Sequence, residues 1–305
     1  MRREAGAGGT AEQAVRNNFL AIAAMVAATF FYLAGDSIVK LVSEEIPVSQ
    51  IIVLRGLFTS ILIAFAAALT GALRDWRRAV DRPILARSMF DGVTTLLIIN
   101  ALAHMAIADA TAVINSVPIV ATVLAVFILK EHVGIRRWAA VIIGFVGVLL
   151  VLRPSGEDFN AYGLLAFAST LTIAGRDIVT RHIGADVPSL VVTLASAIFV
   201  TLIGGVAVLV TGGWADASPE ILVMIAVASL ALFGAYHFSV VAIRLGEVSL
   251  TAPFRYTVIL WGLLVGFLVW GDVPGSIEVS GMVLITLCGL YVVHRERMAR
   301  REARR

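Results

Sequence analysis

The chain has 305 residues, 59% of them hydrophobic and only 15% charged, and its mean hydropathy is +0.94. Soluble domains hold about 45–50% apolar and about 25% charged residues, so this composition excludes a water-soluble fold and makes lipid the solvent for much of the surface. The net charge of +3 does not indicate nucleic acid, because the basic residues lie in short gaps between apolar runs and not on one face. The single cysteine, Cys288, excludes a disulfide framework and a thiolate metal cluster.

Ten uncharged, apolar runs follow a polar N-terminal segment at residues 1–18. In chain order the runs are 17–35, 56–73, 92–108, 110–129, 138–152, 159–175, 187–215, 221–243, 256–271 and 279–293. A helix needs roughly 17–25 residues to cross the hydrocarbon, and several runs reach that length only with a polar flank or one internal charge. Because the runs are continuous and not alternating, membrane strands are excluded. We therefore expect an all-α membrane protein with ten transmembrane helices.

The arginines predict the orientation of these helices. They are concentrated before the first run, between the second and third runs, and in residues 295–305 after the last run. The positive-inside rule then places both termini in the cytoplasm of a bacterial cell, with the protein in the inner membrane and residues 295–305 as a basic cytoplasmic tail. The first apolar run is too long for a signal peptide, so we expect it to remain as the first span.

The sequence repeats itself weakly at a spacing of 141 residues. The shift aligns polar, Pro and Gly positions over more than a hundred residues, among them Asp36 with Asp177, Lys40 with Arg181, Pro47 with Pro188, Gly71 with Gly212, Ser88 with Ser229 and Glu131 with Asp272. Each copy, 19–153 and 159–294, holds five spans, and an odd number means that the second copy enters the membrane from the opposite side. Inverted repeats are typical of transporters whose substrate site lies near the midplane between the copies. The alternative is a duplication retained only for stability.

Several stretches resemble the ten-helix, EamA-type transporters of the drug/metabolite transporter superfamily. They are residues 36–40, 50–55, 110–118, 130–131 and 144–154 in the first half, and 176–181, 246–256, 261, 271–274 and 289–296 in the second. The resemblance implies two EamA repeats in which spans 1–4 and 6–9 surround a cavity and the fifth and tenth lie outside. The segment PFRYTVILW, with GDVP downstream, is similar to a branch that includes bacterial riboflavin and S-adenosylmethionine transporters. At the end of span nine Asp272 stands where the family has Glu.

Charged residues inside a membrane need either a partner or a function. Asp36 and Lys40 are four residues apart on one helix face, as are Asp177 and Arg181, so we expect two structural ion pairs at span ends. Arg55, Asp91 and Arg255 lie deeper. Asp91 and Arg255 are at similar depth and could pair, either as a buried structural contact or as a gate or substrate clamp.

Uncharged polar and aromatic side chains complete the set of substrate-site candidates. Tyr32, Tyr256 and Trp261 could stack on a flat ligand, or they could simply pack. Asn100, Asn115 and His237 add hydrogen-bonding groups within the spans, and a structural bond between helices is the alternative for each. Asp91 and His237 are also candidates for coupling transport to protons. Pro118 and Pro253 interrupt spans four and nine, which either exposes carbonyls to a cavity or kinks the helix.

Other classes of function fit the sequence less well. Asp36 and Asp177 resemble the aspartate pair of an intramembrane protease, but the expected topology places them at opposite ends of spans, whereas such a pair must lie about 3 Å apart. The sequence has no nucleophile elbow, no zinc-like spacing of His and no ATP-binding loop. A channel would show a repeated filter or a ring of charge.

We therefore expect a secondary transporter, not an enzyme, that works by alternating access with a small organic metabolite as its substrate. Riboflavin is the first candidate, and S-adenosylmethionine or an amino-acid-like metabolite carried by an exporter is the alternative. We expect no cofactor, no metal and no ATPase subunit, and either a monomer or a homodimer. The sequence leaves the direction of transport open.

Overall fold

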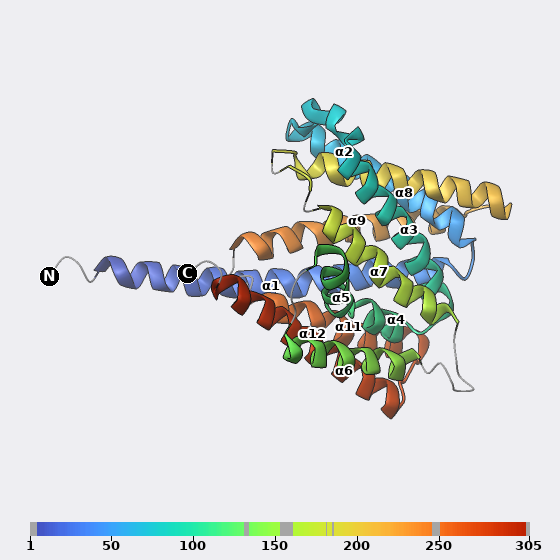
Figure 1. Cartoon of the computed structure of the whole chain (residues 1–305). Coiled ribbons are helices and arrows are strands. Elements are labelled where there is room, and N and C mark those ends of the chain that lie inside the picture. Colours follow the sequence, from blue (N-terminus) through green and yellow to red (C-terminus); the bar gives the residue numbers. More distant parts are fainter. Residues whose placement is uncertain are drawn as a thin grey trace.

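The computed structural model describes residues 5–130, 134–152, 161–180, 182–184, 186–245 and 251–302. These residues form helices and no strands (Figure 1). The helices are α1 (Ala5–Val42), α2 (Val48–Leu69), the 3-10 helix η1 (Ala72–Val80), α3 (Arg82–His104), α4 (Ile107–Ile114), α5 (Val117–Leu129), α6 (Ile135–Leu152), α7 (Tyr162–Thr180), α8 (Ser189–Thr211), α9 (Pro219–Leu245), the 3-10 helix η2 (Ala252–Tyr256), α11 (Thr257–Val265), the π-helical η3 (Gly266–Trp270) and α12 (Ser276–Glu302).

Eight segments of the described chain are long and apolar enough to cross a membrane. They correspond to α1, α2, α3, α4 with α5, α8, α9, η2 with α11 and η3, and α12. The helix within α6, Trp138–Leu152, is apolar but shorter, and α7 carries Arg176 and Asp177 within its length. The protein is therefore a multi-pass membrane protein, and two of the ten expected spans fall below these limits.

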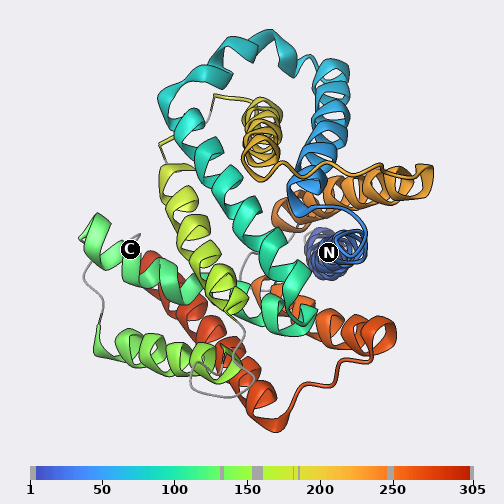
Figure 2. The ribbon, with the colours of Figure 1, turned by 90° about the vertical axis from the view of Figure 1, so that its right-hand side faces the viewer.

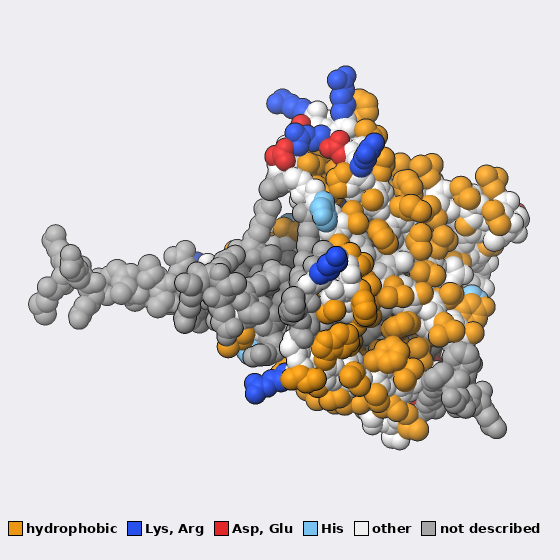
Figure 3. All heavy atoms as spheres, viewed as in Figure 1, with side chains coloured by type: hydrophobic (Ala, Val, Ile, Leu, Met, Phe, Trp, Pro, Cys, Tyr) orange, Lys and Arg blue, Asp and Glu red, His pale blue; other side chains and the backbone are white. Residues whose placement is uncertain are grey.

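The lipid-facing surface is visible in the exposed side chains of α2. Large apolar residues recur every fourth position along one face of this helix, at Leu57, Ile61, Phe65 and Leu69, which are 47%, 64%, 65% and 73% exposed. Such a stripe would be unstable in water, but in a bilayer it is the surface that lipid tails cover. Figure 3 shows the same property over the molecule, since one face is almost entirely apolar apart from the end where Lys and Arg gather.

Four helix pairs join the N-terminal part of the chain to the C-terminal part, and each pair is antiparallel. Along α1 and α9, Met25 lies by Ala242, Phe31 stacks on Phe238, and Gly35 faces Ala228. The other pairs are α3 with α7, α2 with α8, and α6 with α12. In Figures 1 and 2 the α2–α8 pair lies at the top and the α6–α12 pair at the bottom, with α1, α9, α3 and α7 between them.

The ends of the helices match at the spacing of 141. Pro47 precedes α2 and Pro188 precedes α8. After those helices, Gly71 and Gly212 both adopt a left-handed conformation, with φ of 73° and 66°. Lys130 and Gly271 do the same after α5 and η3, with φ of 52° and 71°. This conformation commonly ends helices because it directs backbone N–H groups to the last free carbonyls.

Span four is broken, not continuous. Between α4 and α5, Asn115 and Ser116 leave the helix, and Pro118 is the second residue of α5. Proline has no N–H to donate and clashes with the preceding turn, so a new helix begins here instead of the old one continuing. Pro253 lies within the 3-10 helix η2 that precedes α11. The expected interruptions at both prolines are therefore present.

Glycines bring α6 and α12 into backbone contact. A Cβ atom added at Gly281 would lie 2.6 Å from the carbonyl oxygen of Gly147, and one added at Gly147 would lie 2.9 Å from that of Gly281. Without water between them, membrane helices associate by such close packing of small residues. By contrast, a Cβ at Gly205 on α8 would meet no atom within 4 Å.

Gly281 and Gly205 give a matched pair of substitutions. We expect Gly281→Ala to force α6 and α12 apart and to lower stability by about 1–3 kcal/mol, the usual cost of overpacking. Gly205→Ala should be neutral or stabilising by up to about 1 kcal/mol, because alanine is the better helix former. Thermal unfolding of the two purified variants in detergent measures both effects. Equal melting temperatures would contradict the close contact.

Candidate substrate site

A charged cluster lies where α3, α7 and α8 meet. Asp91 of α3 accepts hydrogen bonds from Arg87, one turn earlier, at 2.8 Å and from Arg176 of α7 at 3.3 Å. Arg176 also binds Asp177 at 2.9 Å. The side chains of Arg87, Asp91 and Arg176 are only 17%, 15% and 25% exposed. Asp91 therefore neutralises charges from both parts of the chain in one half-buried network.

Neutral partners complete this network. Arg87 donates to the hydroxyl of Thr180 on α7 at 3.1 Å and to that of Ser196 on α8 at 2.6 Å. The hydroxyls of Thr94 and Thr172 bond at 2.6 Å one turn deeper between α3 and α7. A buried charge is stable when each of its donors finds an acceptor, so this arrangement holds the three helices together.

A second ion pair joins α1 to α2. Arg55 donates to Asp36 at 3.4 Å, and their side chains are 11% and 29% exposed. Gly35 lies beside the pair, since a Cβ atom there would be 3.9 Å from the guanidinium and 3.2 Å from the Ala228 carbonyl of α9. The hydroxyl of Ser229 on α9 donates to the Ile225 carbonyl of its own helix at 2.8 Å and lies 3.4 Å from the Arg55 carbonyl. This pair therefore also lies against the C-terminal part of the chain.

Two tyrosines stand between the charged groups. Tyr32 of α1 and Tyr236 of α9 meet edge to face, with ring centroids 5.8 Å apart. Tyr32 forms a hydrogen bond with Ser239 and interacts electrostatically with Arg255 and Arg176, while Tyr236 interacts with Asp91, Arg176, Arg87 and Arg55. The rings thus lie near both ion-pair networks. Together they form what we call the central polar cluster: Tyr32, Asp36, Arg55, Arg87, Asp91, Arg176 and Tyr236.

Lys40 shows why the expected Asp36–Lys40 ion pair is wrong. Its ammonium group donates to the carbonyls of Leu102 and Met105 at 3.1 and 2.6 Å and lies 5.3 Å from the ring centre of Trp270. The last carbonyls of α3 have no partner within their own helix, so a cation there is favoured. Asp36 pairs with Arg55 instead.

The expected Asp177–Arg181 ion pair involves Arg181, which lies outside the described residues. Glu131, the expected counterpart of Asp272, also lies outside them. Asp177 pairs with its neighbour Arg176. The proposed Asp91–Arg255 contact is also wrong, since Asp91 is occupied by Arg87 and Arg176 while Arg255 is exposed.

The remaining candidates are spread over other helices. Asn100 and Asn115 donate to carbonyls one turn earlier in their own helices, at 2.7 and 2.8 Å. His237 is exposed and its ring lies edge to face with Phe238. Tyr256 packs against Gly289 of α12, and Trp261 against Phe30 of α1. Of the candidates named from sequence, the structure therefore brings Tyr32, Arg55 and Asp91 together.

Sequence reasoning missed three members of the cluster. Arg87 lies in the basic segment between the second and third apolar runs, Arg176 directly follows the sixth run, and Tyr236 is not among the candidates drawn from the sequence. The four-residue spacing of Arg87 and Asp91 was the available signal, because it is the spacing of an ion pair within one helix. No sequence pattern links either residue to Arg176.

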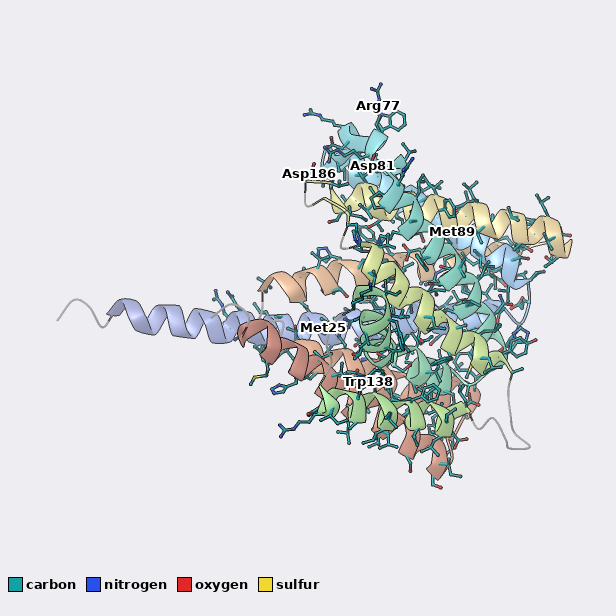
Figure 4. The ribbon with its side chains drawn as sticks, viewed as in Figure 1. Met25, Arg77, Asp81, Met89, Trp138 and Asp186 are labelled. Carbon is teal, nitrogen blue, oxygen red and sulfur yellow. The ribbon has the colours of Figure 1, made fainter. Side chains whose placement is uncertain are left out.

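Away from the cluster, an ion pair ties the start of α8 to the end of the molecule that carries the basic residues. Arg78 of η1 donates to Asp186, and this hydrogen bond holds the pKa of the Asp186 carboxyl below its ordinary value. Figure 4 shows Asp186, Arg77 and Asp81 at this same end of the molecule. Both side chains are well exposed, so the pair contributes little to stability.

Comparison with known proteins finds a family model that matches the N-terminal part of the chain. Residues 19–153 match the model of the EamA-like transporter family. This stretch is an EamA domain. It includes Tyr32, Arg55 and Asp91 of the central polar cluster.

Three proteins that are similar to this chain are named as transporters or exporters. The chain is 26% identical over 191 residues to an S-adenosylmethionine uptake transporter of Rickettsia prowazekii, covering 63% of this chain and 64% of that one. It is 26% identical over 196 residues to a riboflavin transporter of Rhizobium johnstonii, covering 64% of each chain. A pseudopaline exporter of Pseudomonas aeruginosa is 23% identical over 279 residues, covering 86% of this chain and 92% of the exporter.

The matched part therefore spans less than two thirds of the length of the first two relatives. The fold extends further. A protein crystal structure superposes with a TM-score of 0.60 at 16% identity, covering 92% of this chain and 98% of the other. At that identity the likeness concerns the fold, in which the EamA domain and the remaining helices both have counterparts.

The contacts of the cluster predict that the carboxylates of Asp91 and Asp177, which both bind Arg176, contribute unequally to stability. We expect Asp91→Asn to lower stability by roughly 3 kcal/mol, because it leaves Arg87 and Arg176 close together without a counter-charge. Asp177→Asn is the matched control and should cost less than about 1 kcal/mol, since that side chain is 54% exposed. Melting temperatures of the two variants in detergent test this, and the reverse order would show that Asp91 does not hold α3 to α7.

Proposed function

We propose that the protein is a secondary transporter that carries a small organic metabolite across the bacterial inner membrane by alternating access. The observation that carries this proposal is the position of the central polar cluster. Its charged side chains come from α1, α2 and α3 on one side and from α7 on the other, and α9 adds Tyr236, so the cluster lies at the junction of the two parts of the chain. Transporters built from repeats bind their substrates at such a junction.

We further propose that the chain forms two inverted repeats of five spans, with α6 and α7 as the two spans additional to the eight apolar segments. The matched helix ends at a spacing of 141 support this. So do the helix pairs, because exchanging the two parts turns the α1–α9 pair into α7–α3 and leaves α2–α8 and α6–α12 unchanged. Antiparallel pairing is what an axis in the membrane plane produces.

In this proposal both termini lie in the cytoplasm. The start of α1 and the end of α12 lie on the same side of the molecule in Figure 1, and the Lys and Arg side chains of Figure 3 gather at that side. A bias of basic residues toward one side is the expected mark of the cytoplasmic face. The antiparallel contacts between the two halves then become the surfaces that move as the site opens to one side or the other.

The charges of the cluster favour an amphoteric substrate of the S-adenosylmethionine type. Two aspartates and three arginines offer partners for groups of both signs, whereas riboflavin needs mainly flat surfaces and hydrogen bonds. Riboflavin is the second candidate because the Tyr32–Tyr236 pair offers aromatic faces at the same place. Neither requires ATP, a metal or a cofactor in this scheme.

Uptake into liposomes tests the transport proposal. Purified protein should accumulate labelled S-adenosylmethionine or riboflavin with saturable kinetics, and unlabelled substrate inside should accelerate uptake by counterflow. A channel would instead show conductance without saturation or counterflow. Empty liposomes and liposomes holding the Asp91→Asn variant are the controls. If neither substrate is taken up, both proposed substrates are wrong. If the liposomes show conductance instead, the carrier mechanism is wrong.

Labelling of cysteines tests the inverted repeat. In a Cys288→Ala background, Glu45→Cys and Asp186→Cys occupy exposed, equivalent positions 141 residues apart, just before α2 and α8. An impermeant maleimide added to intact cells should label Cys at 45 and leave Cys at 186 for labelling after lysis, because inverted copies place these positions on opposite sides. Labelling of both positions from outside would contradict inversion.

A further inference from the structure

The three arginines of the central polar cluster differ in how fully their donors are used. Arg87 makes three hydrogen bonds to side chains, and Arg176 makes three, all at 2.6–3.3 Å. Within the described residues Arg55 makes one, to Asp36, at the long distance of 3.4 Å. A guanidinium has five N–H donors, so most of the donors of Arg55 form no hydrogen bond with the described part of the protein.

Arg55 is also the most buried of the three, and burial makes unused donors costly. Its side chain is 11% exposed, and its Nε is buried without a hydrogen-bond partner in the described part of the chain. One turn further along α2, the Thr59 hydroxyl is likewise buried without a partner. Residues four apart share a helix face, so two unsatisfied polar groups lie together on α2. Buried polar groups in native proteins nearly always have a hydrogen-bond partner, so two neighbouring exceptions need a specific explanation, and a ligand that supplies the partner is one.

The Arg55 guanidinium has a glycine on its α1 side and an aromatic ring of α9 nearby. Gly35 has no side chain to cover the guanidinium from α1, and Tyr236 of α9 lies within electrostatic range. The Ser229 hydroxyl of α9 lies 3.4 Å from the Arg55 carbonyl. The arginine therefore lies against the opposite half of the chain, and Asp36 holds its head group only loosely.

We infer that Arg55 binds a carboxylate group of the transported substrate, and that Asp36 occupies this position when no substrate is present. The inference rests on the proposed transport function and narrows it to carboxylate-bearing metabolites. A guanidinium recognises carboxylate best in a two-pronged geometry, through two parallel N–H donors. An incoming carboxylate can take Nε and a terminal nitrogen together, whereas Asp36 uses one nitrogen at a long distance.

Matched ligands test the inference directly by binding. The probes are S-adenosylmethionine with its decarboxylated form, and methionine with methioninamide, each measured by the rise in melting temperature of purified protein in detergent. We expect at least one carboxylate member to bind at least tenfold more tightly than its partner. Tenfold is the effect of one charge-assisted hydrogen bond.

Variants separate binding from structure. Arg55→Gln should lose at least tenfold in affinity for the carboxylate member, and Arg55→Lys should retain part of it. Asp36→Asn should bind the carboxylate more tightly than wild type, because the resident competitor is gone. Arg82→Gln, which removes an exposed arginine at the start of α3, should bind like wild type.

A purely structural ion pair predicts a different pattern. In that case Asp36→Asn and Arg55→Gln would both lower the melting temperature without ligand, and Asp36→Asn would gain no affinity. If Arg55→Gln does not fold, the double variant Asp36→Asn/Arg55→Gln, which has no unpaired charge, takes its place and should still lose the preference for carboxylate.

The inference is overturned if no carboxylate probe binds better than its partner, or if Asp36→Asn binds no more tightly than wild type. Uptake into liposomes decides the transport proposal separately. Saturable riboflavin uptake without carboxylate binding would leave the transporter intact and remove the role of Arg55.

Discussion

In an apolar solvent a charged side chain is stable only if it pairs with a group of opposite charge or reaches water. In this protein the partners of the buried charges come from distant parts of the chain. Asp91 is neutralised by one arginine of its own helix and one from α7, and Arg87 reaches α8. The association of the two halves therefore depends on charge neutralisation as well as on close packing, and the place where charges are satisfied is also where a polar substrate could be received.

The outline of the fold followed from the sequence because it depends on local properties. Apolar runs gave the spans, and prolines and glycines marked helix ends at Pro47, Gly71 and Gly212. The start of α3 was missed by ten residues. The segment from Arg82 to Asp91 reads as a charged loop, yet it is helical, because its charges find partners on α7 and α8. A helix of that composition is stable only beside those neighbours.

The contacts of the site were less predictable for the same physical reason. Spacing within one helix suggested that Asp36 would pair with Lys40, but the free carbonyls at the end of α3 hold Lys40, more than sixty residues away. Tyr32, Arg55 and Asp91 were found because a polar group at membrane depth is conspicuous in an apolar run. Which groups meet, and which donors stay unused, depends on helix crossings that no local spacing encodes.

The pairing of helices across the two halves also bears on how the protein is made. The main partners of α1, α2 and α3 are α9, α8 and α7, so each early helix waits for one that has not yet been synthesised. Asp91 enters the membrane some 85 residues before Arg176, a delay of several seconds at a translation rate of roughly 5–20 residues per second. During that interval Arg87, on the same helix, is its available counter-ion. The pair within α3 thus shields a carboxylate in the nascent chain before the second half arrives to complete its coordination.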